Sequence, residues 1–94
     1  MSEQDTQLEN LRRQIDALDK QLLELLSKRM SIVREVGQYK QQHDLEPLDP
    51  ERWQTLLAER LELATSLDLS EAFVSELYRL IHEYALAIEA EAAS

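Results

Sequence analysis

Residues 6–43 carry a regular apolar pattern that predicts one long helix. Apolar side chains recur there in alternating steps of three and four, at Leu8, Leu11, Ile15, Leu18, Leu22, Leu25, Ile32, Val36 and Tyr39. This spacing lines one face of a helix and does not fit the two-residue period of a strand. Thr6 followed by Glu9 is typical of a capping box, so we expect the helix to begin there and residues 1–5 to fray.

One position of this apolar face holds a cation. Between Leu25 and Ile32 the register requires an apolar residue, and the sequence has Arg29. A buried guanidinium costs desolvation free energy unless an anion compensates its charge. We therefore expect Arg29 to meet a negatively charged group.

The rest of the chain predicts two shorter helices. Asp49 and Pro50 are typical of an N-cap and a first helical turn, and that helix is expected to end near Thr65. Asp68 or Ser70 would cap a third helix. The polar residues after Ile88 are expected to fray. Gly37 lies inside the first helix, where the missing side chain lets another backbone or a ligand come close.

Composition favours a single all-α domain spanning 1–94. Aromatic residues make up 5% of the chain, and one glycine and two prolines leave little material for strands and tight turns. The net charge of −9 repels nucleic acid and anionic lipid. The chain has no cysteine, no signal-peptide pattern and no apolar run of membrane-spanning length, so we expect a soluble cytoplasmic protein.

The lengths of the predicted helices indicate a dimer. The first helix would be about 57 Å long, whereas the second and third would reach only about 24 and 32 Å. A single protomer would leave much of the long apolar face uncovered. We expect two three-helix protomers to cover it as an intertwined homodimer.

The candidate binding residues are cations. Lys40 lies eleven residues after Arg29, so on a helix the two point within about 20° of each other and are about 16 Å apart. Arg12 points elsewhere, but the Arg12 of a partner in an antiparallel dimer could reach the same place. With Arg52 of the second helix, such a cluster would suit a small molecule with two carboxylates.

Other site chemistries find no support in the sequence. It has no glycine-rich phosphate loop, no metal-ligand spacing and no serine nucleophile with suitable partners, so we expect no metal. His43 near a helix end is expected to be solvated. For the cations the alternative is solvated ion pairing, in which Arg12, Arg52 and Lys40 pair with Glu9, Glu51 and Glu35.

Four short motifs then carry a family resemblance. The sequences LRxxID, LLxxR, VGxxK and PER begin at residues 11, 25, 36 and 50. Their combination resembles the all-helical chorismate mutases over essentially the whole chain. The resemblance implies three-helix protomers in an intertwined dimer with two active sites. It also implies conversion of chorismate to prephenate, in aromatic amino-acid biosynthesis, without a metal or a cofactor.

The resemblance also implies residue roles. Arg12 would come from the opposite subunit and bind one substrate carboxylate, and Arg29 would bind the other near the ether oxygen. Lys40 would donate to the ether oxygen, and Asp49 and Arg52 would frame the ring side.

Four positions depart from the family pattern. Trp53 replaces a glutamate that receives the ring hydroxyl, Ala85 replaces a serine, His82 replaces an apolar pocket residue and Glu89 replaces a glutamine. Glu89 would have to be protonated to donate to the ether oxygen, so we expect turnover to fall as pH rises through its titration. The alternatives are a half-buried structural role for His82 and an exposed tail carboxylate for Glu89.

Chorismate mutase is therefore the first interpretation, and two others remain open. The bulky ring of Trp53 resembles the isochorismate-pyruvate lyase branch of this fold, and an amino-chorismate mutase is a related possibility. The third interpretation is a weakly active helical dimer with a regulatory or interaction role.

Overall fold

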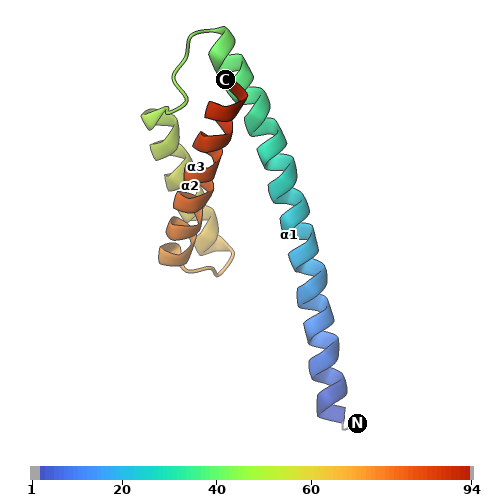
Figure 1. Ribbon diagram of the computed structural model, residues 1–94. Helices are drawn as coiled ribbons and strands as arrows, with labels where there is room; N and C mark the ends of the chain where they lie inside the picture. The colour runs from blue at the N-terminus through green and yellow to red at the C-terminus, as the bar shows by residue number, and fades with distance from the viewer. Residues whose placement is uncertain (1–2, 94) are drawn as a thin grey trace. The chain divides into compact units, whose positions relative to one another are not determined.

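Three helices make up the chain (Figure 1). The computed structural model describes residues 3–93, with side chains described from Asp5, and consists of α1 (Glu3–Gln42), α2 (Pro50–Ser66) and α3 (Glu71–Ala93). No strand occurs in that range, which confirms the all-α class. The chain divides into two compact units, Met1–Ile32 and Val33–Ser94, and the boundary falls within α1. The single domain expected from the sequence stays a prediction.

The unit Met1–Ile32 consists of α1 alone in its described part. The helix begins at Glu3, so Thr6 lies inside it and the predicted start at Thr6 is wrong. Acidic residues are stabilised at a helix N-terminus by the helix dipole, and Asp5 supplies one ahead of the predicted capping box. Residues 1–2 of the predicted frayed segment lie outside the described residues. The apolar face is exposed by 46–62% at Leu8, Leu11, Ile15, Leu18, Leu22 and Leu25.

In the unit Val33–Ser94, α2 and α3 form an antiparallel helical hairpin (Figure 1). The predicted N-cap is confirmed, because Oδ1 of Asp49 accepts a hydrogen bond from the backbone N–H of Arg52 at 3.1 Å. Pro50 occupies the first turn, where its missing N–H has no helical partner to lose. The buried apolar residues of this unit are Leu56, Ala64, Val74, Ala85 and Ile88.

The turn between α2 and α3 contains both residues predicted as the N-cap of α3, Asp68 and Ser70. The hydroxyl of Ser70 accepts a hydrogen bond from the backbone N–H of Phe73 at 3.2 Å, so Ser70 caps the helix. Asp68 instead has a φ of 60°, a left-handed conformation that aspartate tolerates better than most residues, and it ends the preceding helix.

The C-terminal end of α3 differs from the sequence expectation. The helix continues to Ala93, and Ile88 and Glu89 are buried, so the fraying predicted for residues 89–93 is wrong, while Ser94 lies outside the described residues. Close approach to α1 explains the difference. A Cβ built on Gly37 would lie 2.8 Å from Cα and 2.9 Å from the carbonyl oxygen of Glu89. The prediction that Gly37 admits another backbone is confirmed.

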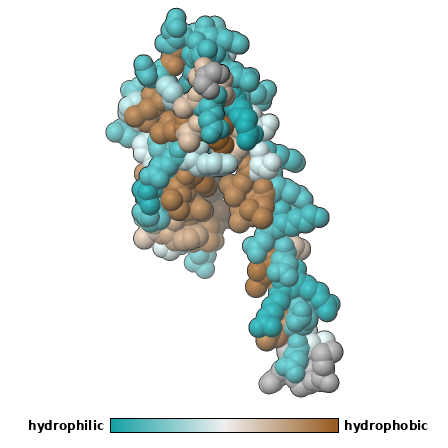
Figure 2. Space-filling view, viewed as in Figure 1, coloured by the Kyte–Doolittle hydropathy of each residue, from teal (hydrophilic) through white to brown (hydrophobic). Residues whose placement is uncertain are grey.

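Large apolar side chains remain exposed across the surface. Figure 2 shows hydrophobic patches both over the α2–α3 hairpin and along α1. The turn end of the hairpin carries a mainly apolar cavity of about 200 Å³, bordered by Leu63, Leu67, Leu69, Phe73 and Leu77 among others. Among the described residues, no helix has the length and apolar character needed to cross a membrane. The cytoplasmic location stays a prediction.

Candidate functional site

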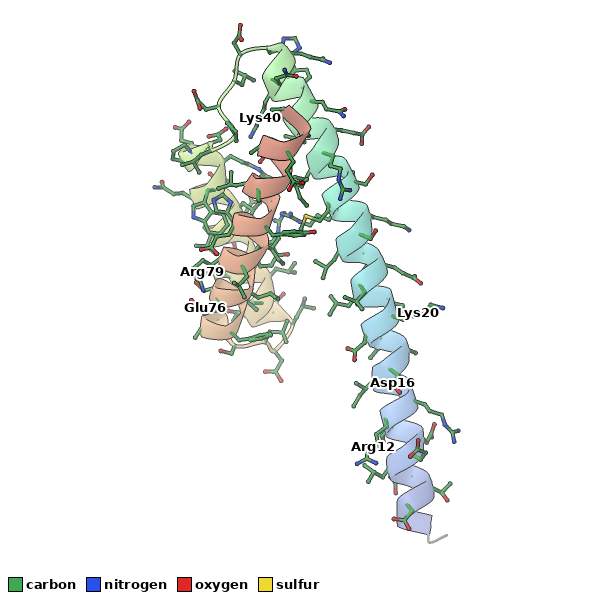
Figure 3. All side chains as sticks on the ribbon, viewed as in Figure 1. Arg12, Asp16, Lys20, Lys40, Glu76 and Arg79 are labelled. Carbon is green, nitrogen blue, oxygen red and sulfur yellow. The ribbon has the colours of Figure 1, made fainter. Side chains whose placement is uncertain are left out.

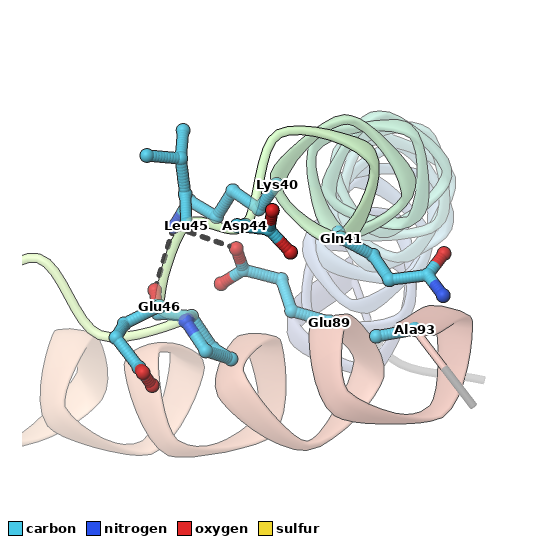
Figure 4. Close-up of a pocket in the computed structure, with 9 residues that line it drawn as sticks. Lys40, Gln41, Asp44, Leu45, Glu46, Glu89 and Ala93 are labelled. Carbon is cyan, nitrogen blue, oxygen red and sulfur yellow. Dashed lines mark hydrogen bonds and ion pairs between the residues drawn. The ribbon is translucent and has the colours of Figure 1, made fainter.

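The structure joins two of the predicted site residues, Lys40 of α1 and Glu89 of α3. Nζ of Lys40 lies 2.8 Å from Oε1 of Glu89 and donates a hydrogen bond to the carbonyl oxygen of Pro47 at 2.6 Å (Figure 4). The side chains of Lys40 and Glu89 are only 20% and 8% exposed. An ion pair screened from water in this way interacts more strongly than one on the surface.

The connection after α1 fixes Lys40 through its backbone as well. The carbonyl oxygen of Lys40 accepts hydrogen bonds from the backbone N–H groups of Leu45 at 2.7 Å and His43 at 3.3 Å. Asp44, between them, has a φ of 55°, which reverses the chain at the helix end. Lys40 also lies in the last turn of α1, where a cation interacts favourably with the helix dipole.

A cavity of about 400 Å³ adjoins this pair (Figure 4). It is lined by Gly37, Lys40, Gln41, Asp44, Leu45, Glu46, Pro47, Glu89 and Ala93. Three of these lining residues, Asp44, Glu46 and Glu89, carry carboxylates, and Lys40 forms its ion pair with Glu89. An additional anion would therefore approach Lys40 favourably only where it displaces or neutralises a carboxylate, and Glu89 is the carboxylate in direct contact.

Trp53 and His82, two of the departures from the family pattern, stack on each other. Their ring centroids are 4.0 Å apart and their planes differ by 13°. Both residues are half-buried. His82, Ala85 and Glu89 follow one another at spacings of three and four on α3, so they share one face of the helix. The stack therefore lies on the same face as Glu89, about 10 Å from it along the helix axis.

Asp49 and Arg52 meet at the start of α2. Their contact is the N-cap hydrogen bond, and both side chains are exposed. Oδ1 of Asp49 is thus engaged by the helix backbone, while the guanidinium of Arg52 faces solvent. Ala85 is buried in the α2–α3 unit.

Arg12 and Arg29 belong to the unit Met1–Ile32. Arg12 is exposed on α1 (Figure 3). Arg29 is half-buried, and its Nη1 atom is buried without a hydrogen-bond partner. An unsatisfied buried donor costs about 1–3 kcal/mol, and an anion would satisfy it. The expectation that Arg29 meets a negative group stays a prediction.

Several alternatives left open by the sequence are now decided. Glu89 is buried and paired, so the alternative of an exposed tail carboxylate is wrong. Lys40 pairs with Glu89 rather than with Glu35. His43 is exposed and its ring lies 4.1 Å from that of Tyr39. Sequence reasoning missed Pro47, because the contact uses a backbone carbonyl, which no residue type reveals.

A second ionic network lies on the exposed surface of α3. Arg79 contacts Glu83 at 2.7 Å and Glu76 at 3.0 Å (Figure 3). The hydrogen bond from Arg79 lowers the pKa of Glu76, and the charge of Arg79 adds to that effect. In return, Glu76 raises the pKa of Arg79. Within the described part of the chain, no group of three or more acidic, histidine or cysteine side chains is arranged to hold a metal ion.

Comparison with known proteins identifies the family. Residues 11–90 match the family described as chorismate mutase type II. The chain belongs to this family. The match includes all four motifs and confirms the resemblance that they carry.

Three relatives give the comparison more detail. The T-protein of Enterobacter agglomerans is 39% identical over 75 residues, covering 80% of this chain and 20% of that protein. The T-protein of Haemophilus influenzae is 36% identical over 72 residues, covering 77% and 19%. The chain therefore spans about a fifth of the length of these two relatives. The 4-amino-4-deoxychorismate mutase of Streptomyces venezuelae is 31% identical over 81 residues, covering 86% of this chain and 78% of that protein.

Proposed function

We propose that this chain is a chorismate mutase that converts chorismate to prephenate in aromatic amino-acid biosynthesis. The observation that carries the proposal is the half-buried Lys40–Glu89 pair beside a cavity, in a chain that belongs to the chorismate mutase type II family. The ammonium of Lys40, a hydrogen-bond donor, lies there 2.8 Å from the carboxylate of Glu89. The family resemblance assigns both positions to the ether oxygen.

The reaction explains why such a site needs no nucleophile. In this Claisen rearrangement the enolpyruvyl arm folds over the ring, one C–O bond breaks and one C–C bond forms, and no proton moves. Negative charge grows on the ether oxygen as the C–O bond breaks. A cation fixed beside that oxygen stabilises the transition state more than the ground state. Lys40, tethered by Pro47, is preorganised for this role.

Glu89 would act with Lys40 on the same oxygen. Without substrate its carboxylate balances the charge of Lys40 at 2.8 Å. When substrate is bound, a protonated Glu89 donates to the ether oxygen.

The remaining cations would bind the two substrate carboxylates. Arg29 has an unsatisfied buried donor, which supports its assignment to one carboxylate. Arg12 would reach the other from the partner subunit of an intertwined dimer built on the long helix α1. The exposed apolar face of α1 supports this dimer, because pairing would remove it from water. Arg52 and Asp49 would frame the ring, beside Ala85.

A second candidate is a sister enzyme acting on isochorismate or an amino-chorismate. Trp53 and His82 stack where the family pattern has a glutamate and an apolar residue, so no carboxylate stands there to receive a ring hydroxyl. The similarity to a protein named 4-amino-4-deoxychorismate mutase favours the amino substrate among these alternatives. A weakly active interaction dimer is the third candidate.

Product analysis separates these candidates. The purified protein is incubated separately with chorismate, isochorismate and 4-amino-4-deoxychorismate, and the products are identified by mass spectrometry. We expect prephenate from chorismate. Salicylate and pyruvate from isochorismate, or preferred turnover of the amino substrate, would replace the proposal with a sister activity. Negligible turnover of all three would leave the interaction dimer.

A further inference from the structure

We infer that Gly37 is a positioning residue, which sets the distance between Lys40 and Glu89 by admitting the backbone of α3 against α1. The effect on catalysis rests on the proposed function, whereas the effect on the ion pair does not. Gly37 touches no reacting group in this assignment. It acts through the separation of two helices.

The space around Gly37 has no room for a side chain. A Cβ atom there would lie 2.8 Å from Cα and 2.9 Å from the carbonyl oxygen of Glu89, and 3.2 Å from Cβ of Ala92. Ordinary contacts of a Cβ atom begin at 3.4 Å. Two of the three atoms belong to the backbone, so they cannot rotate away as a side chain can. An alanine at this position therefore forces α1 and α3 apart locally.

The displaced residue is the one that carries the buried carboxylate. Glu89 contributes both the backbone atoms next to Gly37 and the Oε1 atom next to Lys40. Gly37 precedes Lys40 by three residues, so both lie on the same side of α1. The ammonium is held from the other side by the carbonyl oxygen of Pro47 at 2.6 Å. Lys40 therefore cannot follow Glu89 outward without losing this second contact.

Helix propensity predicts the direction in which Gly37→Ala would change the stability of the protein if nothing hindered it. Alanine is a better helix former than glycine, so an unhindered Gly-to-Ala change in a helix interior stabilises the protein. Destabilisation by Gly37→Ala would thus report the steric contact. The neighbouring exposed residue Gln38 provides a matched control, because Gln38→Ala changes the same helix without entering the contact.

The test is a double-mutant cycle in activity. We expect Gly37→Ala to lower kcat on chorismate about 10- to 100-fold, the range that follows a misplacement of about 1 Å. KM should change little, because the carboxylate-binding arginines are not displaced. In a Glu89→Ala background the same change should cost less than about threefold, because the group that Gly37 positions is gone. Equal losses in both backgrounds, or no loss in Gly37→Ala, would overturn the inference.

The same four proteins are compared by thermal unfolding. Glu89→Ala should lower the midpoint less in the Gly37→Ala background than in the parent chain, because the ion pair is already broken there. An undiminished effect would overturn the inference. This readout needs no substrate, so an inactive parent chain would refute the proposed function while the positioning role is still tested.

A second variant covers the case in which Gly37→Ala does not fold. Ala92→Val adds volume to the same contact from the side of α3, near the end of the chain. We expect a smaller loss of kcat than for Gly37→Ala, with KM again little changed. Full activity in Ala92→Val, beside a Gly37→Ala variant that does not fold, would contradict the inference.

Discussion

Replacing Glu89 with glutamine tests how strongly its ion pair stabilises the fold. The side chain is 8% exposed and its Oε1 atom lies 2.8 Å from Nζ of Lys40. At that distance an effective dielectric constant of about 20 gives a gross attraction of about 6 kcal/mol. Desolvation of both groups offsets most of it. Glutamine keeps an oxygen for Lys40, so we expect a net loss of about 1–2 kcal/mol.

Thermal unfolding followed by far-UV circular dichroism measures this loss. For a chain of this size, 1 kcal/mol corresponds to roughly 4–8 °C, so Glu89→Gln should lower the Tm by about 5–15 °C at neutral pH. Glu62→Gln is the matched control, because Glu62 is exposed on α2 and its replacement removes the same charge. That variant should stay within about 0.5 kcal/mol of the parent chain. If Glu89→Gln were as stable as Glu62→Gln, the ion pair would contribute nothing and the reasoning would fail.

Three further predictions concern other parts of the chain. Lys40→Met should lower kcat about 100- to 1,000-fold, because it removes the fixed donor at the ether oxygen. Lys20→Met on the same helix is the control and should leave kcat unchanged. Equal activities of the two variants would contradict the role of Lys40. The fluorescence of Trp53 should change in His82→Leu, because the replacement removes the ring that stacks on the indole, and an unchanged emission spectrum would contradict that stack. Glu76→Gln should lower the Tm slightly at neutral pH and leave it unchanged in acid. Because the pKa of Glu76 is lowered in the folded protein, its ionised carboxylate stabilises the fold at neutral pH, and this stabilisation is lost as pH falls through that pKa.

The sequence predicts the local features of this fold well because local chemistry decides them. Asp49 and Pro50 set the start of α2 through one side-chain hydrogen bond and one missing N–H group, and both effects are visible in neighbouring residues. The start of α1 shows the limit of such patterns. Thr6 and Glu9 have the right spacing for a capping box, but the helix already begins at Glu3. A capping pattern indicates a position at which a helix is able to start, but it does not prevent the helix from starting earlier in the chain.

Contacts between distant residues were the least predictable part of the site. The sequence indicates Lys40 and Glu89 for separate reasons, and it places Glu89 in a segment that we expect to fray. Forty-nine positions separate them, and only the packing of α3 beside Gly37 brings them together. The stack of Trp53 on His82 likewise joins two departures from the family pattern that the sequence gives no reason to pair. For Arg29 the structure adds a buried Nη1 atom without a hydrogen-bond partner, and the anion expected there stays a prediction.

The tether between Lys40 and Pro47 limits how the connection between α1 and α2 can be altered. This short segment holds the ammonium by one backbone oxygen and holds the helix end by the N–H group of Leu45. Inserting a single residue before Pro47 would shift that oxygen by about 3 Å while leaving every helix sequence intact. Engineers who splice tags or loops into helical proteins usually choose such connections. In this chain the residues between Asp44 and Pro50 would be a poor choice, and a graft should be made at the turn after α2 instead.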